Sequence, residues 1–335
     1  MIMPHPALKR PHKHRSTEVY YYEAPPPPPP PSRLKRLANL PAARRDTLQR
    51  VPFYLFVALV PLFLPQYLRR NADPAFMAGP TVLRAGQTLA IRADKADNRH
   101  TYYFSLDGAN YGTFQPDDTG LPRGLLPLKL ETRPGLHTLA VRQHLYNKTV
   151  FATSVFVKSG VTGAIRLRLP KARRKKILGK TAELRAAKKA FGAAFDDKTK
   201  RQLWRGTFIL PVPGRFSSPH GQLRLLPNGK KTFHRGQDIA TPVGTPVLAA
   251  NTGLVTLAAR YPLQGNLVVL AHGQEVYSLY EHLDTILVEE GTLLQKGRQL
   301  GTSGNTGYST GPHLHWGIMA RGVLVDPVQW LSKEF

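Results

Sequence analysis

Short apolar segments separated by glycine fill most of the chain from residue 79 onward, and this pattern constrains the fold most. Between residues 79 and 160 the segments are rich in β-branched and aromatic residues, as in 88–91 and 101–104. Segments of the same kind return from Phe208 to the C-terminus, again with many glycines. Because such short runs bounded by glycine are typical of strands, the sequence predicts a mainly β protein.

The first 68 residues have a different character. Residues 1–50 carry ten Lys or Arg against three acidic residues and an unbroken proline run over 25–31, which predicts a disordered, basic tail. In residues 51–68 Gln66 is the only strongly polar residue, and eighteen residues of helix span roughly 27 Å, enough for a thin hydrocarbon core. We therefore expect a transmembrane signal-anchor over 51–68; a buried core helix and a cleaved signal peptide stay open as alternatives.

The positive-inside rule orients this expected anchor, because the basic residues precede it. The tail would lie in the cytoplasm and everything after the anchor outside the cytoplasmic membrane, in the periplasm or wall space. The predicted localisation is thus the cell envelope, anchored in the membrane. The expected domains are a cytoplasmic tail (1–50), the anchor (51–68), a β-rich, sandwich-like module (75–160), a basic helical linker (161–205) and a C-terminal domain (206–335).

Composition narrows the classes of function. The absence of cysteine excludes disulfide scaffolds, cysteine zinc fingers, iron–sulfur clusters and thiol catalysis. A net charge of +26 predicts an anionic partner. The basic linker would then contact anionic envelope polymers or lipid head groups, and with no helix-turn-helix or RNA motif we expect no nucleic acid partner. A solvated linker that touches nothing specific is the alternative, and the oligomeric state has no sequence signature.

Five residues of the C-terminal domain form a pattern with chemical content. His234 and Asp238 stand four apart, and His313 and His315 are two apart, so in a strand they share one face. His282 lies between them in the apolar run 276–283. Three nitrogen or oxygen ligands plus a water make a catalytic zinc site, and a His/Asp/His set is available here. Two histidines would remain for proton transfer or for stabilising an oxyanion.

The segment from about residue 204 to 328 resembles the LytM-type zinc peptidases of family M23, which hydrolyse peptide bonds in bacterial peptidoglycan. The resemblance implies a small domain built on antiparallel β-sheet, with the metal in a groove. It rests on motifs that include His234-Arg-Gly-Gln-Asp238, Tyr280-Glu-His-Leu283, Gly304-Asn-Thr-Gly307 and Ser309-Thr-Gly-Pro-His-Leu-His-Trp316.

This resemblance implies roles for the five residues. His234, Asp238 and His315 match the family's ligands of Zn²⁺, while His282 and His313 match the pair beside the metal-bound water, one as general base and one as stabiliser of the tetrahedral intermediate. Which residue takes which role stays open, as does the peptide bond that is cut. The implied function is a zinc-dependent endopeptidase acting on peptidoglycan peptides. The alternative is a non-catalytic scaffold of the same type that binds wall or activates an amidase.

The chain departs from the family pattern at one place. Where relatives have Phe-Gly-x-Arg, this sequence has His220-Gly-Gln-Leu-Arg224, which predicts a different loop length at one rim of the groove. We interpret Arg224 as a structural, salt-bridging arginine, although it can also supply positive charge near the site. His220 is interpreted as a surface or loop residue.

Overall fold

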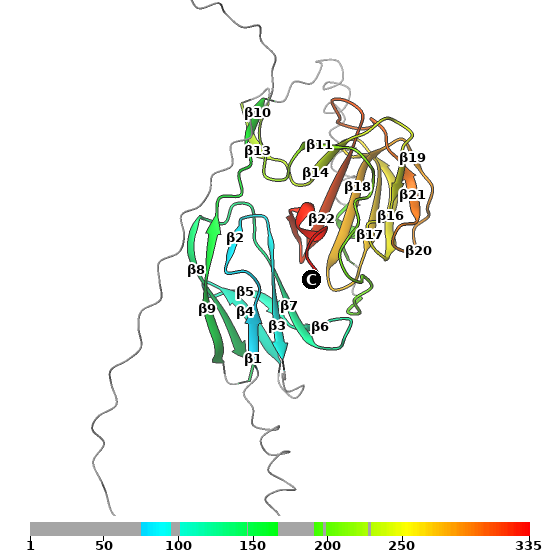
Figure 1. The fold of residues 1–335 in the computed structure, drawn as a ribbon. Helices are drawn as coiled ribbons and strands as arrows, with labels where there is room; N and C mark the ends of the chain where they lie inside the picture. The colour runs from blue at the N-terminus through cyan, green and yellow to red at the C-terminus, as the bar shows by residue number, and fades with distance from the viewer. Residues whose placement is uncertain (1–74, 95–100, 146, 167–190, 197–198, 227–228) are drawn as a thin grey trace, which may run out of the picture. The chain divides into compact units, whose positions relative to one another are not determined.

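The computed structural model describes residues 75–94, 101–145, 147–166, 191–196, 199–226 and 229–335. Within them the chain is mainly β and nearly all strand pairs are antiparallel, which confirms the fold class expected from the short glycine-bounded segments (Figure 1). Two pairs are parallel, β2 with β9 and β10 with β12.

The first nine strands form two sheets around one core. Their orders are β1-β3-β7-β6 and β2-β9-β8-β4-β5. Buried side chains from both sheets, among them Leu89, Phe104 and Val141, belong to the same apolar cluster, which is the layered arrangement of a sandwich. The strands are β1 (Ala75–Ala78), β2 (Val82–Arg84), β3 (Thr88–Asp94), β4 (Tyr102–Leu106), β5 (Ala109–Thr113), β6 (Gln115–Pro116), β7 (Pro122–Pro127), β8 (Gly135–Gln143) and β9 (Lys148–Lys158).

The C-terminal region is built on an eight-stranded sheet. Its order is β11-β14-β22-β18-β17-β16-β20, with β23 paired to β22, and two three-stranded sheets, β10-β12-β13 and β15-β21-β19, accompany it. The elements are β10 (Ala164–Arg166), β11 (Arg215–Ser218), β12 (Leu223–Leu225), β13 (Lys231–Phe233), β14 (Gln237–Ala240), β15 (Pro246–Leu248), β16 (Gly253–Tyr261), β17 (Gly265–Ala271), β18 (Val276–Leu283), β19 (Thr285–Ile286), β20 (Leu293–Leu294), β21 (Gln299–Thr302), β22 (His313–Ala320), β23 (Val323–Val325) and helix α4 (Pro327–Trp330).

Strand alternation explains why the middle of the large sheet is buried on both faces. Along β17, Val268 and Leu270 join one apolar cluster while Leu267 and Val269 join another. Successive strand residues point to opposite faces, so a continuous apolar run such as this one serves two cores. These central strands therefore form a fixed support for the residues at the ends of β14, β18 and β22.

The predicted membrane anchor is corrected by the structure. None of the helices in the described part of the chain is long and apolar enough to cross a membrane. The residues predicted as tail and anchor, 1–50 and 51–68, lie outside the described residues. The predicted localisation in the cytoplasmic membrane through a single-pass helix is therefore not supported.

The predicted helical linker over 161–205 is corrected in one part. Residues 164–166 form strand β10, which pairs with β12 of the C-terminal region, so this part of the linker extends a sheet. The run from Lys171 to Lys176 and most of the expected helix lie outside the described residues, and residues 191–193 are helical. A short segment beside a strand with free backbone groups gains hydrogen bonds by pairing, which the charge pattern of the segment does not reveal.

Candidate metal centre

Three side chains from adjoining segments converge at one point. His234 follows β13, Asp238 lies in β14, and His315 lies in β22 directly opposite Asp238 in the strand register. Asp238 Oδ1 lies 2.9 Å from His234 Nε2 and 2.7 Å from His315 Nδ1, and the two histidine nitrogens are 2.9 Å apart. One ligand atom from each residue thus falls within 4.8 Å of the others, a spacing that suits a single metal ion.

Backbone contacts fix the tautomer of His234. Its Nδ1 lies 3.0 Å from the carbonyl oxygen of Pro219, which can only accept, so Nδ1 carries the proton and donates it there. The lone pair of Nε2 is then left for the cluster. Metal-ligating histidines characteristically use their second nitrogen in this way. Since His234 is also buried, its ring is held rigidly in the orientation that a ligand needs.

Electrostatics favours the ligand form of two of these groups. Burial lowers the pKa of His234 to about 4, against a hydrogen bond to Asp238 that raises it, so the imidazole is neutral at neutral pH. Burial raises the pKa of Asp238, but the close contacts with His234 and His315 outweigh it and hold the pKa well below its usual range. Neutral imidazole and ionised carboxylate are the forms that bind a metal, so these donors fit one.

His315 differs, because its pKa is raised. Burial alone would lower that pKa, but the hydrogen bond to Asp238 and the negative charges of Glu281 and Asp238 raise it. Glu281 stands opposite His315 in the register of β18 and β22, and burial raises its own pKa. A metal ion at this point would compete with a proton for His315, so metal binding should weaken as the pH falls.

Two more histidines adjoin the cluster. The His282 ring centre lies 4.9 Å from that of His313 and 6.2 Å from that of His315, and His313 Nε2 is 3.8 Å from Asp238 Oδ1. His282 Nδ1 donates to the carbonyl of Thr306 at 2.9 Å, and His313 Nδ1 lies 2.7 Å from that of Gly311. Each ring therefore keeps Nε2 as the acceptor.

The backbone at His282 adopts a conformation that side chains rarely take. Its φ is 65°, in the left-handed region, where a residue with a β-carbon is strained. Burial, and then the neighbouring charges of His313 and His315, lower the pKa of His282 to about 3. The strained residue is thus a buried, neutral base beside the cluster.

The structure also places Arg224 and His220. Arg224, interpreted as a structural, salt-bridging arginine, donates from Nη2 to Asp238 Oδ2 at 2.8 Å, so its ion-pair partner belongs to the cluster itself. His220, interpreted as a surface or loop residue, lies in a turn but is buried against Gly86, where an added β-carbon would lie 2.6 Å from its ring. Tyr280 accepts a hydrogen bond from the backbone of Ala250 at 2.8 Å and is fully buried, in keeping with a packing role.

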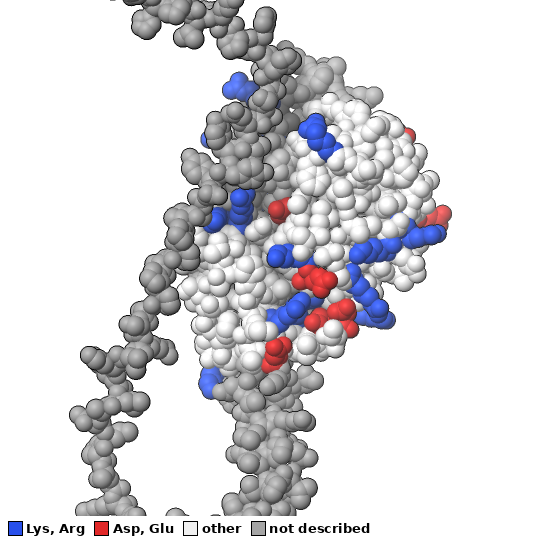
Figure 2. Space-filling view, in the orientation of Figure 1, with Lys and Arg blue, Asp and Glu red and all other residues white. Residues whose placement is uncertain are grey.

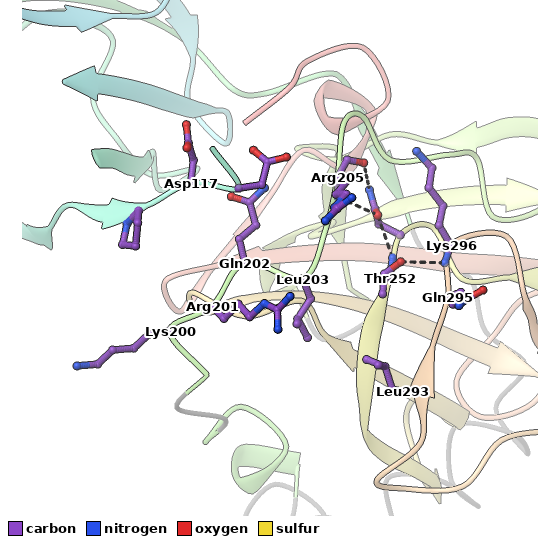
Figure 3. Close-up of a pocket in the computed structure, with 13 residues that line it drawn as sticks. Asp117, Lys200, Arg201, Gln202, Leu203, Arg205, Thr252, Leu293, Gln295 and Lys296 are labelled. Carbon is purple, nitrogen blue, oxygen red and sulfur yellow. Dashed lines mark hydrogen bonds between the residues drawn. The ribbon is translucent and has the colours of Figure 1, made fainter. Parts of the chain in front are cut away.

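A separate cleft lies away from this cluster. It has a volume of about 860 Å³ and, as Figure 3 shows, basic side chains such as Arg201, Arg205 and Lys296 line it together with Asp117. Lys296 donates from Nζ to a backbone carbonyl at 2.6 Å. None of the five histidine and aspartate residues singled out from the sequence lines this cleft, so it is not the candidate centre.

Comparison with known proteins points to one family. The chain is 40% identical over 136 residues to the peptidoglycan DD-endopeptidase ShyA of Vibrio cholerae serotype O1, a match that covers 40% of this chain and 32% of ShyA. It is 40% identical over 114 residues to the DD-carboxypeptidase/endopeptidase Mpg of Neisseria meningitidis serogroup B, covering 34% of this chain and 26% of Mpg. The chain thus matches about a third or less of these relatives' lengths.

A solved structure is also similar to part of the chain. The catalytic domain of the antimicrobial peptidase lysostaphin from Staphylococcus simulans is 29% identical, with 39% of this chain and 93% of that chain covered and a TM-score of 0.28. Residues 232–327 match the model of peptidase family M23, and this segment contains all five histidine and aspartate residues of the cluster. Residues 232–327, in the C-terminal part of the chain, are therefore the segment that matches peptidase family M23.

Proposed function

We propose that the protein is a zinc-dependent endopeptidase that hydrolyses peptide bonds in cell-wall peptidoglycan. The observation that carries the proposal is the convergence of His234, Asp238 and His315 within 4.8 Å, with His282 and His313 beside them. Two histidines and a carboxylate are the ligand set of a catalytic zinc site with an open position. The substrate and the specificity are proposed from the names of the relatives: ShyA is named a peptidoglycan DD-endopeptidase and Mpg a DD-carboxypeptidase/endopeptidase.

In this proposal each residue has a defined task. His234, Asp238 and His315 hold the metal, which when bound supplies Lewis-acid chemistry for hydrolysis. His282 and His313 handle the proton, since each offers an unprotonated Nε2 while Nδ1 is held by a backbone carbonyl. The low pKa of His282 keeps that ring neutral at neutral pH, so Nε2 can accept a hydrogen bond from the attacking water and orient it. The other ring stabilises charge at the carbonyl oxygen of the scissile bond in its protonated form, in which Nε2 carries a proton and donates it in a hydrogen bond to that oxygen.

We also propose the domain limits expected from the sequence, with a β module over 75–160 and the peptidase domain over 206–335. Contact of the basic linker with anionic envelope polymers or lipid head groups is a further proposal. It rests on the net charge of +26 and on the Lys171 to Lys176 run, which lies outside the described residues. On the face shown in Figure 2, basic and acidic side chains lie interspersed, so this face of the described residues offers no basic patch of its own.

Product analysis tests the proposed activity. The full chain, stripped of metal, is incubated with intact peptidoglycan with and without added Zn²⁺, and the released fragments are identified by mass spectrometry. We expect zinc-dependent release of fragments with new peptide amino termini at the cross-links. A folded, zinc-loaded protein that releases nothing would refute the enzyme and favour a scaffold that binds wall or activates an amidase.

A further inference from the structure

Arg224 divides the two oxygens of Asp238 between different partners. Its Nη2 donates to Asp238 Oδ2 at 2.8 Å, while Oδ1 of the same carboxylate faces His234 and His315 at 2.9 Å and 2.7 Å. A hydrogen bond between a guanidinium and a carboxylate is short and directional. It therefore fixes the rotation of the carboxylate, so that one oxygen stays turned to the point where the predicted ligands meet.

The same guanidinium is linked to a second ligand through Ser218. Arg224 Nη2 also donates to Ser218 Oγ at 3.0 Å, and Ser218 Oγ lies 3.2 Å from His234 Nδ1. Ser218 in turn donates to Gln222 Oε1 at 2.7 Å. One connected group of side chains thus touches two of the three predicted ligands from the side opposite the cluster.

The strand that carries Arg224 is held from both sides. On one side β13 pairs with it antiparallel and runs directly into His234. On the other side β10 pairs with it parallel, with Ile165 beside Arg224, and the backbone N–H of Leu223 donates to the carbonyl of Gly163 at 2.8 Å. Because β12 is the central strand of this sheet, β10 and β13 together limit how far it can move.

These supporting residues all precede the matched family segment 232–327. Ser218, Arg224 and β10 lie upstream of it, and β10 belongs to the stretch that the sequence predicted to be a helical linker. The orientation of Asp238 therefore depends on a part of the chain that the family match does not include.

We propose that Arg224 is a positioning residue that orients Asp238 for the metal ion, and that strand β10 holds Arg224 in place. The inference rests on the proposed role of His234, Asp238 and His315 as metal ligands. Loss of an outer-shell partner of a metal ligand typically lowers metal affinity about 10–100-fold, and this is the loss we expect for Arg224→Gln. Arg224→Lys keeps the charge but not the planar fork, so its loss should be smaller.

Zinc affinity of the full chain tests the role of Arg224. The dissociation constant is measured by competition with a chelating dye, and Co²⁺ substituted for zinc reports the ligand geometry through its visible absorption spectrum. Arg260→Gln is the matched control, because Arg260 is an exposed arginine on β16. For Arg224→Gln we expect a dissociation constant that is about 10–100-fold higher and an altered Co²⁺ spectrum. For the control we expect both to be unchanged.

A second pair of variants tests strand β10. Ile165→Pro removes a backbone N–H and disfavours pairing with β12, whereas Ile165→Ser changes only a side chain that is 37% exposed. We expect weaker zinc binding for the proline variant alone. The circular dichroism and melting temperature of each metal-free variant show whether it is folded, and if Arg224→Gln is unfolded the lysine variant takes its place.

The outcomes separate this inference from the proposed function. Wild-type protein that binds no zinc would refute the metal site and this inference with it. The inference alone would be refuted if the wild-type protein binds zinc and the folded Arg224→Gln and Ile165→Pro variants have the same zinc affinity and Co²⁺ spectrum as the wild type.

Discussion

Replacing Gly236 by alanine should damage the metal centre although the residue is not a ligand. A β-carbon at this position would lie 2.6 Å from both Cε1 and Nε2 of His315 and 2.7 Å from the carbonyl oxygen of Trp316. Carbon atoms pack best at about 3.5 Å or more, so the ring must move by about 0.9 Å or the backbone must give way. The His315 ring can turn away, but the Trp316 carbonyl belongs to β22, which is paired on both sides, so the contact with that oxygen adds backbone strain.

The size of the effect follows from this displacement. Overpacking of a buried site costs about 1–3 kcal/mol, which corresponds to a fall in melting temperature of about 2–12 °C for a domain of this size. Metal sites need their ligands within about 0.5 Å of the working geometry, so the moved ring should also bind zinc less tightly.

A second glycine near the same site provides a control for this prediction. Gly311 lies near the same site, but a β-carbon there meets no atom within 4 Å. Differential scanning calorimetry of the metal-free proteins and zinc titration by competition with a dye should therefore show losses for Gly236→Ala and none for Gly311→Ala. Equal melting temperatures and zinc affinities for the two variants would refute the steric argument.

Three further predictions follow from the described contacts. His282→Ala or His313→Ala should lower peptidoglycan hydrolysis about 10²–10⁴-fold while zinc content, measured by atomic absorption, stays near one per chain; unchanged rates would exclude the proton-transfer role. Tyr280→Phe leaves the buried N–H of Ala250 without its acceptor and should cost about 1–3 kcal/mol in urea unfolding, and a neutral result would contradict this. Burial lowers the pKa of His272 to about 4, so the unfolded state binds a proton at this residue more tightly than the folded state does. The free energy of unfolding should therefore fall as the pH drops below about 6.5, and His272 accounts for a loss of about 2 kcal/mol at pH 5. This contribution should be absent in His272→Asn.

Much of the fold was predictable because its signals are local. Glycine-bounded runs of β-branched residues predicted the strands of both regions, and the spacing of His313 and His315 predicted that both side chains lie on one face of a strand. The five residues of the candidate centre could be selected because metal ligation restricts the residue types that can serve.

The supporting contacts could not be predicted, because they depend on which strands become neighbours. The residues of β10 are of types equally common in solvated linkers, so its pairing with β12 has no local signal. Likewise, Arg and Asp are common in surface ion pairs, so their types do not show that Arg224 contacts Asp238. The burial of His220, which lies in a turn, was missed for the same reason, since nothing in its local sequence shows that Gly86 covers it. The departure from Phe-Gly-x-Arg was the one signal pointing to this region.

Metal dependence of the reaction at this cluster is the central claim. The full chain and its Asp238→Ala variant are stripped of metal, titrated with Zn²⁺, and assayed for release of soluble fragments from purified peptidoglycan. The account predicts that one equivalent of zinc restores hydrolysis to the wild-type protein, and that the folded variant neither retains zinc nor hydrolyses its substrate. Full activity of the metal-free wild type, or equal activity of the Asp238→Ala variant, would contradict it.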